Sequence, residues 1–160
     1  MANDSSPGRD DVVALYGRLL GAWNARDAGA FADQFTGSGS SVGFDGSQLD
    51  GRDAIRAELA RIFADHTPAT YVARVREVRV LGRGVTLLRA VAGMVPPGAQ
   101  AIKPERNVIQ NLVAVADEGA PRIALYQNTP ARFDGRPELA DALTAELTAV
   151  HRGGRVVDPG

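Results

Sequence analysis

The order of sequence patterns predicts an α+β fold: a cone-shaped, curved antiparallel sheet with helices packed on its concave face, plus an extra C-terminal helix. Helical patterns gather in the first 65 residues, and β-prone runs follow one another between residues 70 and 129. Strands joined by turns form an antiparallel meander, and the preceding helices must bury their apolar stripes against one sheet face. A bent sheet closed by helices encloses a cavity, where ligand sites are common.

Composition limits the class of protein. The 160 residues include no cysteine and carry a formal net charge of −1. These values exclude disulfides and give no electrostatic footprint for nucleic acid or an anionic membrane. The scarcity of lysine among the 18 basic residues indicates a GC-rich bacterial genome. We expect a cytoplasmic protein without nucleic-acid or membrane partners and, with two distant histidines, without a metal or other cofactor.

The chain divides into a lead-in, one domain and a tail. Residues 1–10 are polar and lack the regions of a signal peptide, so we expect them to be disordered. A single domain is expected over residues 11–152, and it includes a C-terminal helix over residues 136–152. Glycines end that helix, and residues 153–160 are expected to form a loose tail.

Helical spacing of apolar residues recurs in four segments. Residues 11–25 form one stripe with Asp10 or Asp11 as the expected N-cap, and Asp27 can cap a short second helix. Residues 52–65 predict a third amphipathic helix. Pro137 suits the first turn of the last helix, whose stripe comprises Leu139, Leu143, Leu147 and Val150.

The remaining patterns are those of strands and turns. Residues 42–46 predict a short strand that enters an Asp-Gly turn. Longer strands are expected over residues 70–81, 85–95, 107–116 and 122–129, with a proline-containing loop over residues 96–104.

The last two strands carry five side-chain amides and no Asp, Glu, Lys or His. Amides compete with strands for backbone hydrogen bonds, so their presence needs a reason. They can orient a ligand but supply no proton-transfer group. The alternatives are strand ends, solvent or a partner subunit. The five are Asn107, Gln110, Asn111, Gln127 and Asn128.

Three segments carry a family resemblance: AWNARDAGAFADQF at residues 22–35, LDGRDAIRAEL at residues 49–59 and IALYQNTPARF at residues 123–133. They resemble the nuclear transport factor 2-like (NTF2-like) superfamily, which includes ketosteroid isomerases and SnoaL-like polyketide cyclases. Together they look most like a small subgroup from enediyne antibiotic clusters. The resemblance implies a homodimer through the outer sheet face, and a pocket between the concave face and the helices.

The catalytic set of ketosteroid isomerases is not retained. The alignment that the resemblance implies puts Leu19 at the tyrosine donor, Gly43 at the carboxylate base, and Gln110 or Asn111 at the neutral acid. Matching the acid position favours Asn111 in the pocket, with Gln127 across from it. An amide could donate to an oxyanion, but no base accompanies it.

Three residues remain as catalytic candidates: Asp45, His66 and Tyr126. Asp45 is the nearest carboxylate to the missing base, although an Asp-Gly turn already explains it. His66 ends a helix, where a cation complements the helix dipole, and it is the alternative base. Tyr126 could stabilise an enolate.

The leading hypothesis is a small-molecule-binding protein of secondary-metabolite biosynthesis whose ligand is a largely apolar polyketide-type intermediate; the ligand class comes from the resemblance. The alternatives are a cofactor-free isomerase, cyclase or oxygenase acting on that intermediate, and a non-catalytic subunit of a biosynthetic complex. The expected ligand-binding residues are Trp23, Phe31, Phe44, Phe63, Gln110, Asn111, Leu125 and Gln127.

Overall fold

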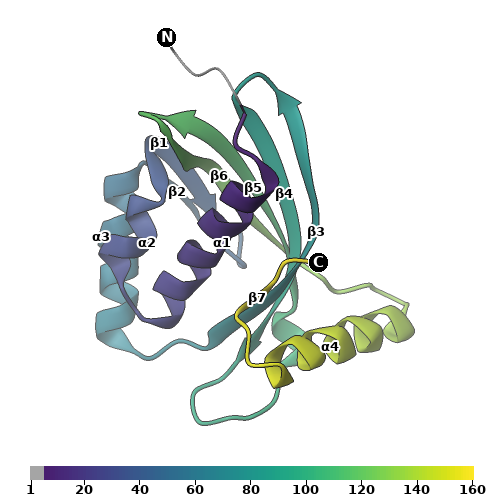
Figure 1. Ribbon diagram of the computed structural model, residues 1–160. Coiled ribbons are helices and arrows are strands. Elements are labelled where there is room, and N and C mark those ends of the chain that lie inside the picture. The colour runs from purple at the N-terminus through teal and green to yellow at the C-terminus, as the bar shows by residue number, and fades with distance from the viewer. Residues whose placement is uncertain (1–5) are drawn as a thin grey trace.

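A bent sheet with helices on both faces makes up residues 6–160, the part of the chain that the computed structural model describes (Figure 1). The elements are α1 (Arg9–Asn24), α2 (Ala28–Asp33), β1 (Phe35–Val42), β2 (Gln48–Asp50), α3 (Arg52–Asp65), β3 (Thr70–Gly82), β4 (Val85–Val95), η1 (Pro104–Arg106), β5 (Val108–Asp117), β6 (Ala120–Pro130), α4 (Pro137–Arg152) and β7 (Val157–Asp158). The predicted α+β class, with a curved and unclosed sheet, is confirmed.

The sheet has the strand order β2-β1-β6-β5-β4-β3-β7. Strands β3 to β6 form the predicted antiparallel meander. β1 joins it by pairing parallel with β6, and the pairing shifts register between Phe35 and Ser40. An added Cβ at Gly39 would lie 2.6 Å from the Ile123 carbonyl oxygen, so this close crossing requires glycine.

The three N-terminal helices cover the concave face of the sheet. The apolar stripe of α1 packs on side chains that alternate along the strands, because only every second strand residue points to this face. Fully buried members of this core include Leu15, Leu19, Leu88, Leu112 and Ile123.

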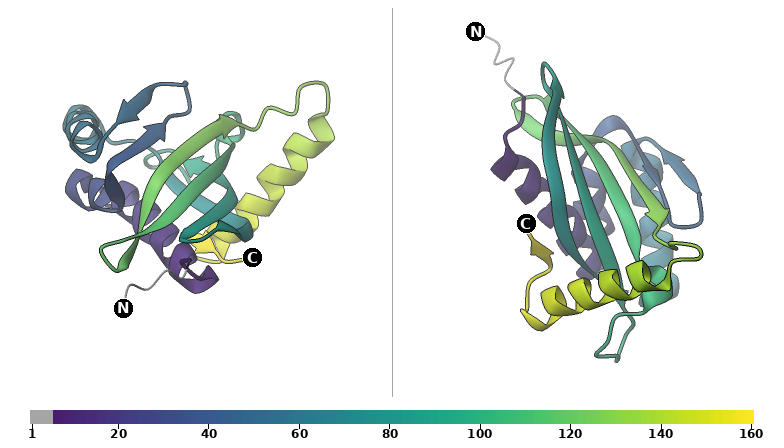
Figure 2. Two further views of the ribbon diagram at one scale, coloured as in Figure 1. Left: turned by 90° about the horizontal axis from the view of Figure 1, so that it is seen from above. Right: turned by 90° about the vertical axis from the view of Figure 1, so that its right-hand side faces the viewer.

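Helix α4 packs on the opposite, outer face of the sheet, as both views in Figure 2 show. An added Cβ at Gly93 would lie 3.0 Å from the Leu147 Cδ1, so glycine lets the helix lie close to β4. The helix therefore occupies part of the face through which the resemblance implies a dimer. Its buried contacts involve Val72, Val91, Val95, Ile102, Leu143, Leu147 and Val150.

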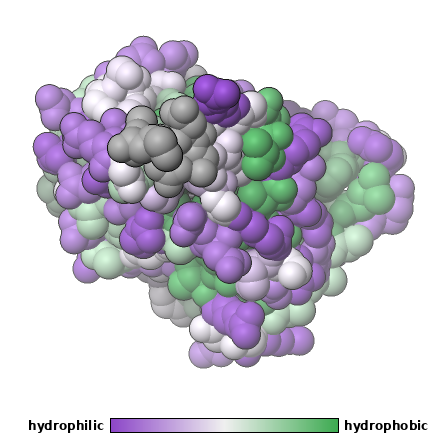
Figure 3. All heavy atoms as spheres, turned by 45° about the horizontal axis from the view of Figure 1, so that its top comes forward, coloured by the Kyte–Doolittle hydropathy of each residue, from purple (hydrophilic) through white to green (hydrophobic). Residues whose placement is uncertain are grey.

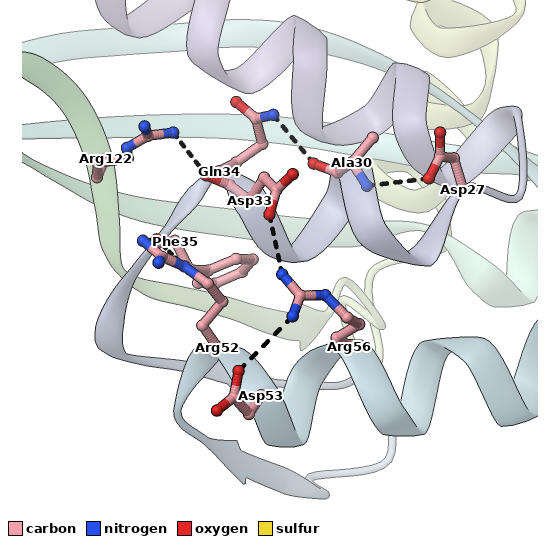
Figure 4. Close-up of polar contacts among 9 residues, drawn as sticks. All are labelled: Asp27, Ala30, Asp33, Gln34, Phe35, Arg52, Asp53, Arg56 and Arg122. Carbon is pink, nitrogen blue, oxygen red and sulfur yellow. Dashed lines mark hydrogen bonds and ion pairs between the residues drawn. The ribbon is translucent and has the colours of Figure 1, made fainter.

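Arginine side chains hold α3 against α2 and β1 (Figure 4). Arg52 donates to the Phe35 carbonyl oxygen from Nε at 3.0 Å and from Nη2 at 2.6 Å. Arg56 pairs with the Asp33 carboxylate at 3.0 Å, and Arg122 of β6 donates to the Asp33 carbonyl oxygen at 2.6 Å. These contacts fix α3 as one wall of the space over the sheet.

Two predictions about local structure were wrong. Gly8, and not Asp10 or Asp11, is the N-cap residue of α1; the two carboxylates lie in the first turn, where they complement the helix dipole. The strand expected over residues 42–46 is instead β1, which ends at Val42 and is followed by a turn in which Gly46 N donates to Gly43 O. Asp27 does cap α2, by accepting from Ala30 N at 3.0 Å.

Both ends of the described chain are tied to the sheet. The segment expected to be a loose tail contains β7, which pairs parallel with β3. Of the expected disordered lead-in, residues 1–5 lie outside the described residues. Beyond them, the Ser6 hydroxyl donates to Gly82 O at 2.9 Å and accepts from Gly84 N at 3.0 Å. The chain therefore lies against the β3–β4 turn before α1 begins.

Exposed apolar side chains are scattered. On the face seen in Figure 3, hydrophobic atoms form separate patches between hydrophilic ones. Val80 and Leu81, next to the β3–β4 turn, are 60% and 53% exposed. Small apolar patches of this kind are ordinary on globular proteins and define no site.

A group of ion pairs joins α4 and β7 to β3. Arg74 contacts Glu146 at 3.1 Å and Asp158 at 3.0 Å, and Arg76 also binds Glu146. Hydrogen bonds from Arg76 and Arg74 lower the pKa of Glu146. The Gly160 N–H and then Arg74 lower the pKa of Asp158.

Acid is therefore expected to weaken the attachment of α4. Because both folded-state pKa values are depressed, the stabilisation is present above the ordinary values of 4.5 for Glu and 3.8 for Asp, and it is lost as the pH falls below them. In urea unfolding at a series of pH values, Glu146→Gln should lower stability by up to about 1 kcal/mol at neutral pH and flatten the acid decline. Glu118→Gln, in the exposed β5–β6 turn, should leave the decline unchanged; equal effects of the two variants would contradict this assignment.

Candidate functional site

A pocket of about 520 Å³ opens between the concave face of the sheet, α3 and the β1–β2 turn. This volume is typical of small-molecule sites, which span roughly 300–1,000 Å³. Side chains from α1, α2, α3, η1 and five strands line it, so the complete fold is needed to form it.

Aromatic rings form the inner wall of this pocket. The Trp23 ring centroid lies 6.1 Å from that of Phe31 and 5.4 Å from that of Tyr71, and the Phe31 centroid lies 6.3 Å from that of Tyr126. Trp23 Nε1 donates to the Ala69 carbonyl oxygen at 2.8 Å, which fixes the indole orientation. The wall is therefore apolar and preorganised.

A buried chain of hydrogen bonds lies behind that wall. The Tyr16 hydroxyl of α1 donates to Gln110 Oε1 at 2.5 Å, and Gln110 Nε2 donates to Asn128 Oδ1 at 2.9 Å. Asn128 Nδ2 then donates to the Val42 carbonyl oxygen at 2.9 Å. These two amides connect α1, β5, β6 and β1, and Asn128 also reaches the pocket surface.

Tyr126 brings an unpaired hydroxyl to the pocket. Its Oη is buried near the Tyr71 hydroxyl and the Asn128 side chain, both of which influence its pKa, but it makes no hydrogen bond of normal length and angle with residues 6–160. Burial raises the pKa of Tyr126 well above its ordinary value, and burial also raises the pKa of Tyr71 to about 12. Both phenols therefore stay protonated at neutral pH, and a buried unpaired hydroxyl gains from a ligand that accepts its proton.

The outer part of the pocket carries charge. The Arg106 guanidinium carbon lies 4.1 Å from the centroid of the Phe44 ring, a cation–π contact. The neighbouring Asp45 carboxylate accepts from Ser47 N at 2.9 Å, and this bond, together with the Arg106 charge, lowers the pKa of Asp45. Glu58 and Arg61, which also line the pocket, pair with each other.

The sequence-predicted residues separate into those that line the pocket and those that do not. The pocket brings together Trp23, Phe31, Phe44, Asp45 and Tyr126. Phe63 lies behind the wall, with its ring centroid 5.4 Å from that of Trp23, and Gln110 is fully buried in the hydrogen-bond chain. His66 is exposed after the end of α3 and is not part of the lining.

Asn111, Leu125 and Gln127 lie on the outer face of the sheet, so the expectation that they face the pocket was wrong. Asn111 Oδ1 accepts from Arg89 Nε at 2.9 Å on that face. The register of β5 and β6 shifts between Val113 and Ala114, which pair with Leu125 and Ile123. This bulge lets Ile123 and Tyr126 both face the core, whereas strict alternation would place Ile123 on the same face as Leu125.

Sequence reasoning missed several lining residues, among them Asn128, Tyr71 and Arg106. Asn128 belonged to the amide set, for which a strand end was one of the alternatives, and Tyr71 stood at the start of β3 without a special pattern. Arg106 follows the irregular loop after β4, where no periodicity predicts a side-chain direction. Its neighbour Phe44 comes from a segment 62 residues earlier, so only the fold brings them together.

Metal ligands do not cluster in the described part of the chain: residues 6–160 contain no group of three or more His, Cys, Asp or Glu side chains placed to hold an ion. Within the same range, every helix is too short or too polar to cross a membrane.

Comparisons with known proteins define the fold. A cystatin-like-fold domain of unknown function from Nostoc punctiforme superposes with a TM-score of 0.73 at 20% identity, covering 91% of this chain and 90% of that chain. An NTF2-like protein of unknown function from Shewanella oneidensis gives a TM-score of 0.59 at 14% identity, covering 75% and 97%. A ketosteroid isomerase-like protein from Erwinia carotovora atroseptica gives 0.57 at 15% identity, covering 76% and 95%. No protein-family model and no curated protein matches the sequence.

The architecture and these superpositions place the protein in the structural class of cystatin-like, α+β cone folds. Within that class, the structural neighbours include an NTF2-like and a ketosteroid isomerase-like protein, so the fold agrees with the one that the three sequence segments suggested. At these identities the similarity establishes the fold and leaves the enediyne subgroup as an expectation.

Proposed function

We propose that this protein binds a largely apolar small molecule in the pocket over the concave sheet face. The observation that carries the proposal is a preformed cavity of about 520 Å³ whose aromatic wall includes a buried tyrosine hydroxyl without a partner. Apolar pockets with a few convergent polar groups are the usual form of small-molecule sites.

The protonation states favour binding over proton transfer. A general base works best with a pKa near the operating pH. The pKa of Asp45 is lowered by the Ser47 N–H, and that of Glu58 by its hydrogen bond from Arg61, so both carboxylates are weak bases. Burial shifts the tyrosines the other way. The lining therefore supplies hydrogen-bond donors but no group poised to accept a proton.

Catalysis is the second candidate, and the unpaired Tyr126 hydroxyl favours it. A protonated phenol in an apolar site can stabilise the oxyanion of an enolate during an isomerisation, cyclisation or oxygenation. Asp45, which lines the pocket, would then act as the base; His66, the alternative base expected from the sequence, lies outside the lining. Turnover of the pathway intermediate that persists in the Asp45→Asn and His66→Gln variants would exclude that pair.

The ligand class is part of the proposal. The sequence resemblance suggests a polyketide-type intermediate of enediyne or related antibiotic biosynthesis, and the aromatic wall suits a flat, apolar molecule. The proposal also includes a homodimer that forms through the outer face of the sheet. The part of that face that α4 does not cover presents Leu125 and Gln127.

Binding can be measured with N-phenyl-1-naphthylamine, an uncharged apolar dye whose emission rises in apolar surroundings. Ile62 lines the pocket from α3 and lies outside the main core cluster. Ile62→Glu should weaken dye binding by about tenfold or more, because a charge on the apolar wall loses hydration when the dye enters. The matched control is Ala60→Glu, which adds the same charge to an exposed position of the same helix. Equal affinities of the two variants would show that the dye binds elsewhere, and no binding by the wild-type protein would count against the proposal.

A further inference from the structure

Arg106 is a pocket cation that forms no ion pair with the described residues, although the Asp45 carboxylate lies within its electrostatic influence. The other lining arginine, Arg61, pairs with Glu58 and Asp65. The Arg106 side chain makes neither an ion pair nor a hydrogen bond with residues 6–160; its guanidinium lies over the Phe44 ring, and its charge acts on Asp45 and Tyr71. A guanidinium offers five N–H donors in a planar fork that matches carboxylate geometry, so this group has unused binding capacity inside the site.

The position of Arg106 is held by local structure. It ends η1, where Arg106 N donates to Lys103 O at 3.0 Å and Asn107 N donates to Pro104 O at 3.2 Å. The guanidinium carbon lies over the Phe44 ring, and none of the guanidinium N–H groups donates a hydrogen bond to residues 6–160, so they can bind a ligand. The side chain is only half-buried, so the charge remains hydrated in the empty site.

The unpaired Tyr126 hydroxyl supplies a second, independent polar contact. Tyr126 is 3% exposed, whereas Arg106 lies nearer the surface, so the two donors stand at different depths of the same cavity. The same lining also contains the apolar or aromatic side chains of Phe31, Tyr71 and Met94. A ligand that satisfies both donors has an anionic group and a separate oxygen acceptor on an apolar body.

We propose that the pocket selects an apolar, aromatic-sized acid: Arg106 binds its anionic group, and Tyr126 donates a hydrogen bond to a carbonyl or other acceptor oxygen deeper in the cavity. This inference rests on the proposed function, and it adds the charge and polarity of the ligand. The Asp45 carboxylate is expected to weaken anion binding, because its negative charge lies close enough to Arg106 to interact with it.

Two aromatic sulfonates and one neutral dye test this selection. Anthraquinone-2-sulfonate carries an anion and carbonyl oxygens, anthracene-2-sulfonate carries the anion alone, and N-phenyl-1-naphthylamine carries neither. Trp23, the only tryptophan of the chain, lines the pocket, so quenching of its emission reports occupancy by the sulfonates. Circular dichroism of each variant verifies that the fold is retained.

Arg106→Gln should weaken both sulfonates by about tenfold or more, the effect of losing a charge-assisted hydrogen bond, and change the neutral dye by less than about twofold. Tyr126→Phe keeps the ring and should weaken anthraquinone-2-sulfonate by about fivefold without affecting anthracene-2-sulfonate. Asp45→Asn should strengthen both sulfonates. The control Arg89→Gln removes a cation from the groove between α4 and the outer sheet face and should change none of these affinities.

The outcomes separate this inference from the proposed function. If the neutral dye binds in the pocket but Arg106→Gln weakens all three probes equally, or none of them, anion selection is wrong and apolar binding stands. If Arg89→Gln and not Arg106→Gln abolishes sulfonate binding, the anions occupy the outer groove and the inference is overturned. Failure of all three probes to bind would remove both proposals.

Discussion

Replacing Gln110 with leucine is expected to lower the free energy of unfolding by about 3 kcal/mol. The Gln110 side chain is 0% exposed, accepts from the Tyr16 hydroxyl and donates to Asn128. Leucine has a similar volume, so the loss does not come from a cavity. It comes from a buried tyrosine hydroxyl and a buried amide oxygen that are left without partners, each at a cost of roughly 1–3 kcal/mol.

Gln127→Leu is the matched control, because it makes the same change in the neighbouring strand but on the outer face. Gln127 is exposed, and its substitution should shift stability by less than about 0.5 kcal/mol. Urea unfolding of both variants gives the comparison. In the double variant Tyr16→Phe/Gln110→Leu the unpaired hydroxyl is gone, so part of the stability should return. A double variant that merely adds the two losses would show that the hydrogen-bond chain is not the cause.

Truncating Leu147 should be the most damaging change in α4. Leu147 is 0% exposed and packs against the outer sheet face, close to Gly93. Leu147→Ala is expected to lower the free energy of unfolding by about 3 kcal/mol, since it removes buried methyl groups and leaves a cavity under the helix.

Leu139→Ala provides the comparison, because Leu139 belongs to the same predicted stripe but is 39% exposed. Its loss should cost less than about 1 kcal/mol. Hydrogen exchange of the α4 amides then distinguishes two ways of failing: faster exchange limited to α4 and β7 means that the helix detaches by itself, and faster exchange throughout means that it is part of one cooperative unit. Similar losses from both leucines would contradict the burial of Leu147.

Local sequence signals predicted most of the elements. The third helix was expected over residues 52–65 and forms there as α3, because an apolar stripe and a preceding glycine define it without reference to the rest of the chain. Asp27 was expected to cap α2 and does so. β1 was missed because its Thr-Gly-Ser-Gly-Ser sequence has no β-prone alternation. It becomes a strand by pairing with β6, which is distant in sequence.

The site was predicted in part. Large aromatic side chains on helices α1 and α2 are buried against the sheet that these helices cover. Trp23 and Phe31 therefore line the pocket, as expected from the sequence. The side-chain amides of β5 and β6 do not lie where the sequence predicted. Gln110 belongs to a buried hydrogen-bond network, Asn128 lines the pocket, and Asn111 and Gln127 face outward. Asn111 pairs with Gln127 and Gln110 pairs with Asn128, so each pair shares one face of the sheet, and only the packing of the helices decides that the face of Gln110 and Asn128 is the concave one.

By itself, the sequence determined the α+β class, the meander and the aromatic character of the cavity, because hydrophobic periodicity and turn residues act over a few neighbouring positions. Only the tertiary structure decided which sheet face is concave, that α4 covers the other one, and that Arg106 meets Phe44 beside an unpaired Tyr126 hydroxyl. These features depend on strand register and on contacts between distant segments. A shift of one residue in register turns a side chain from the pocket to the opposite face.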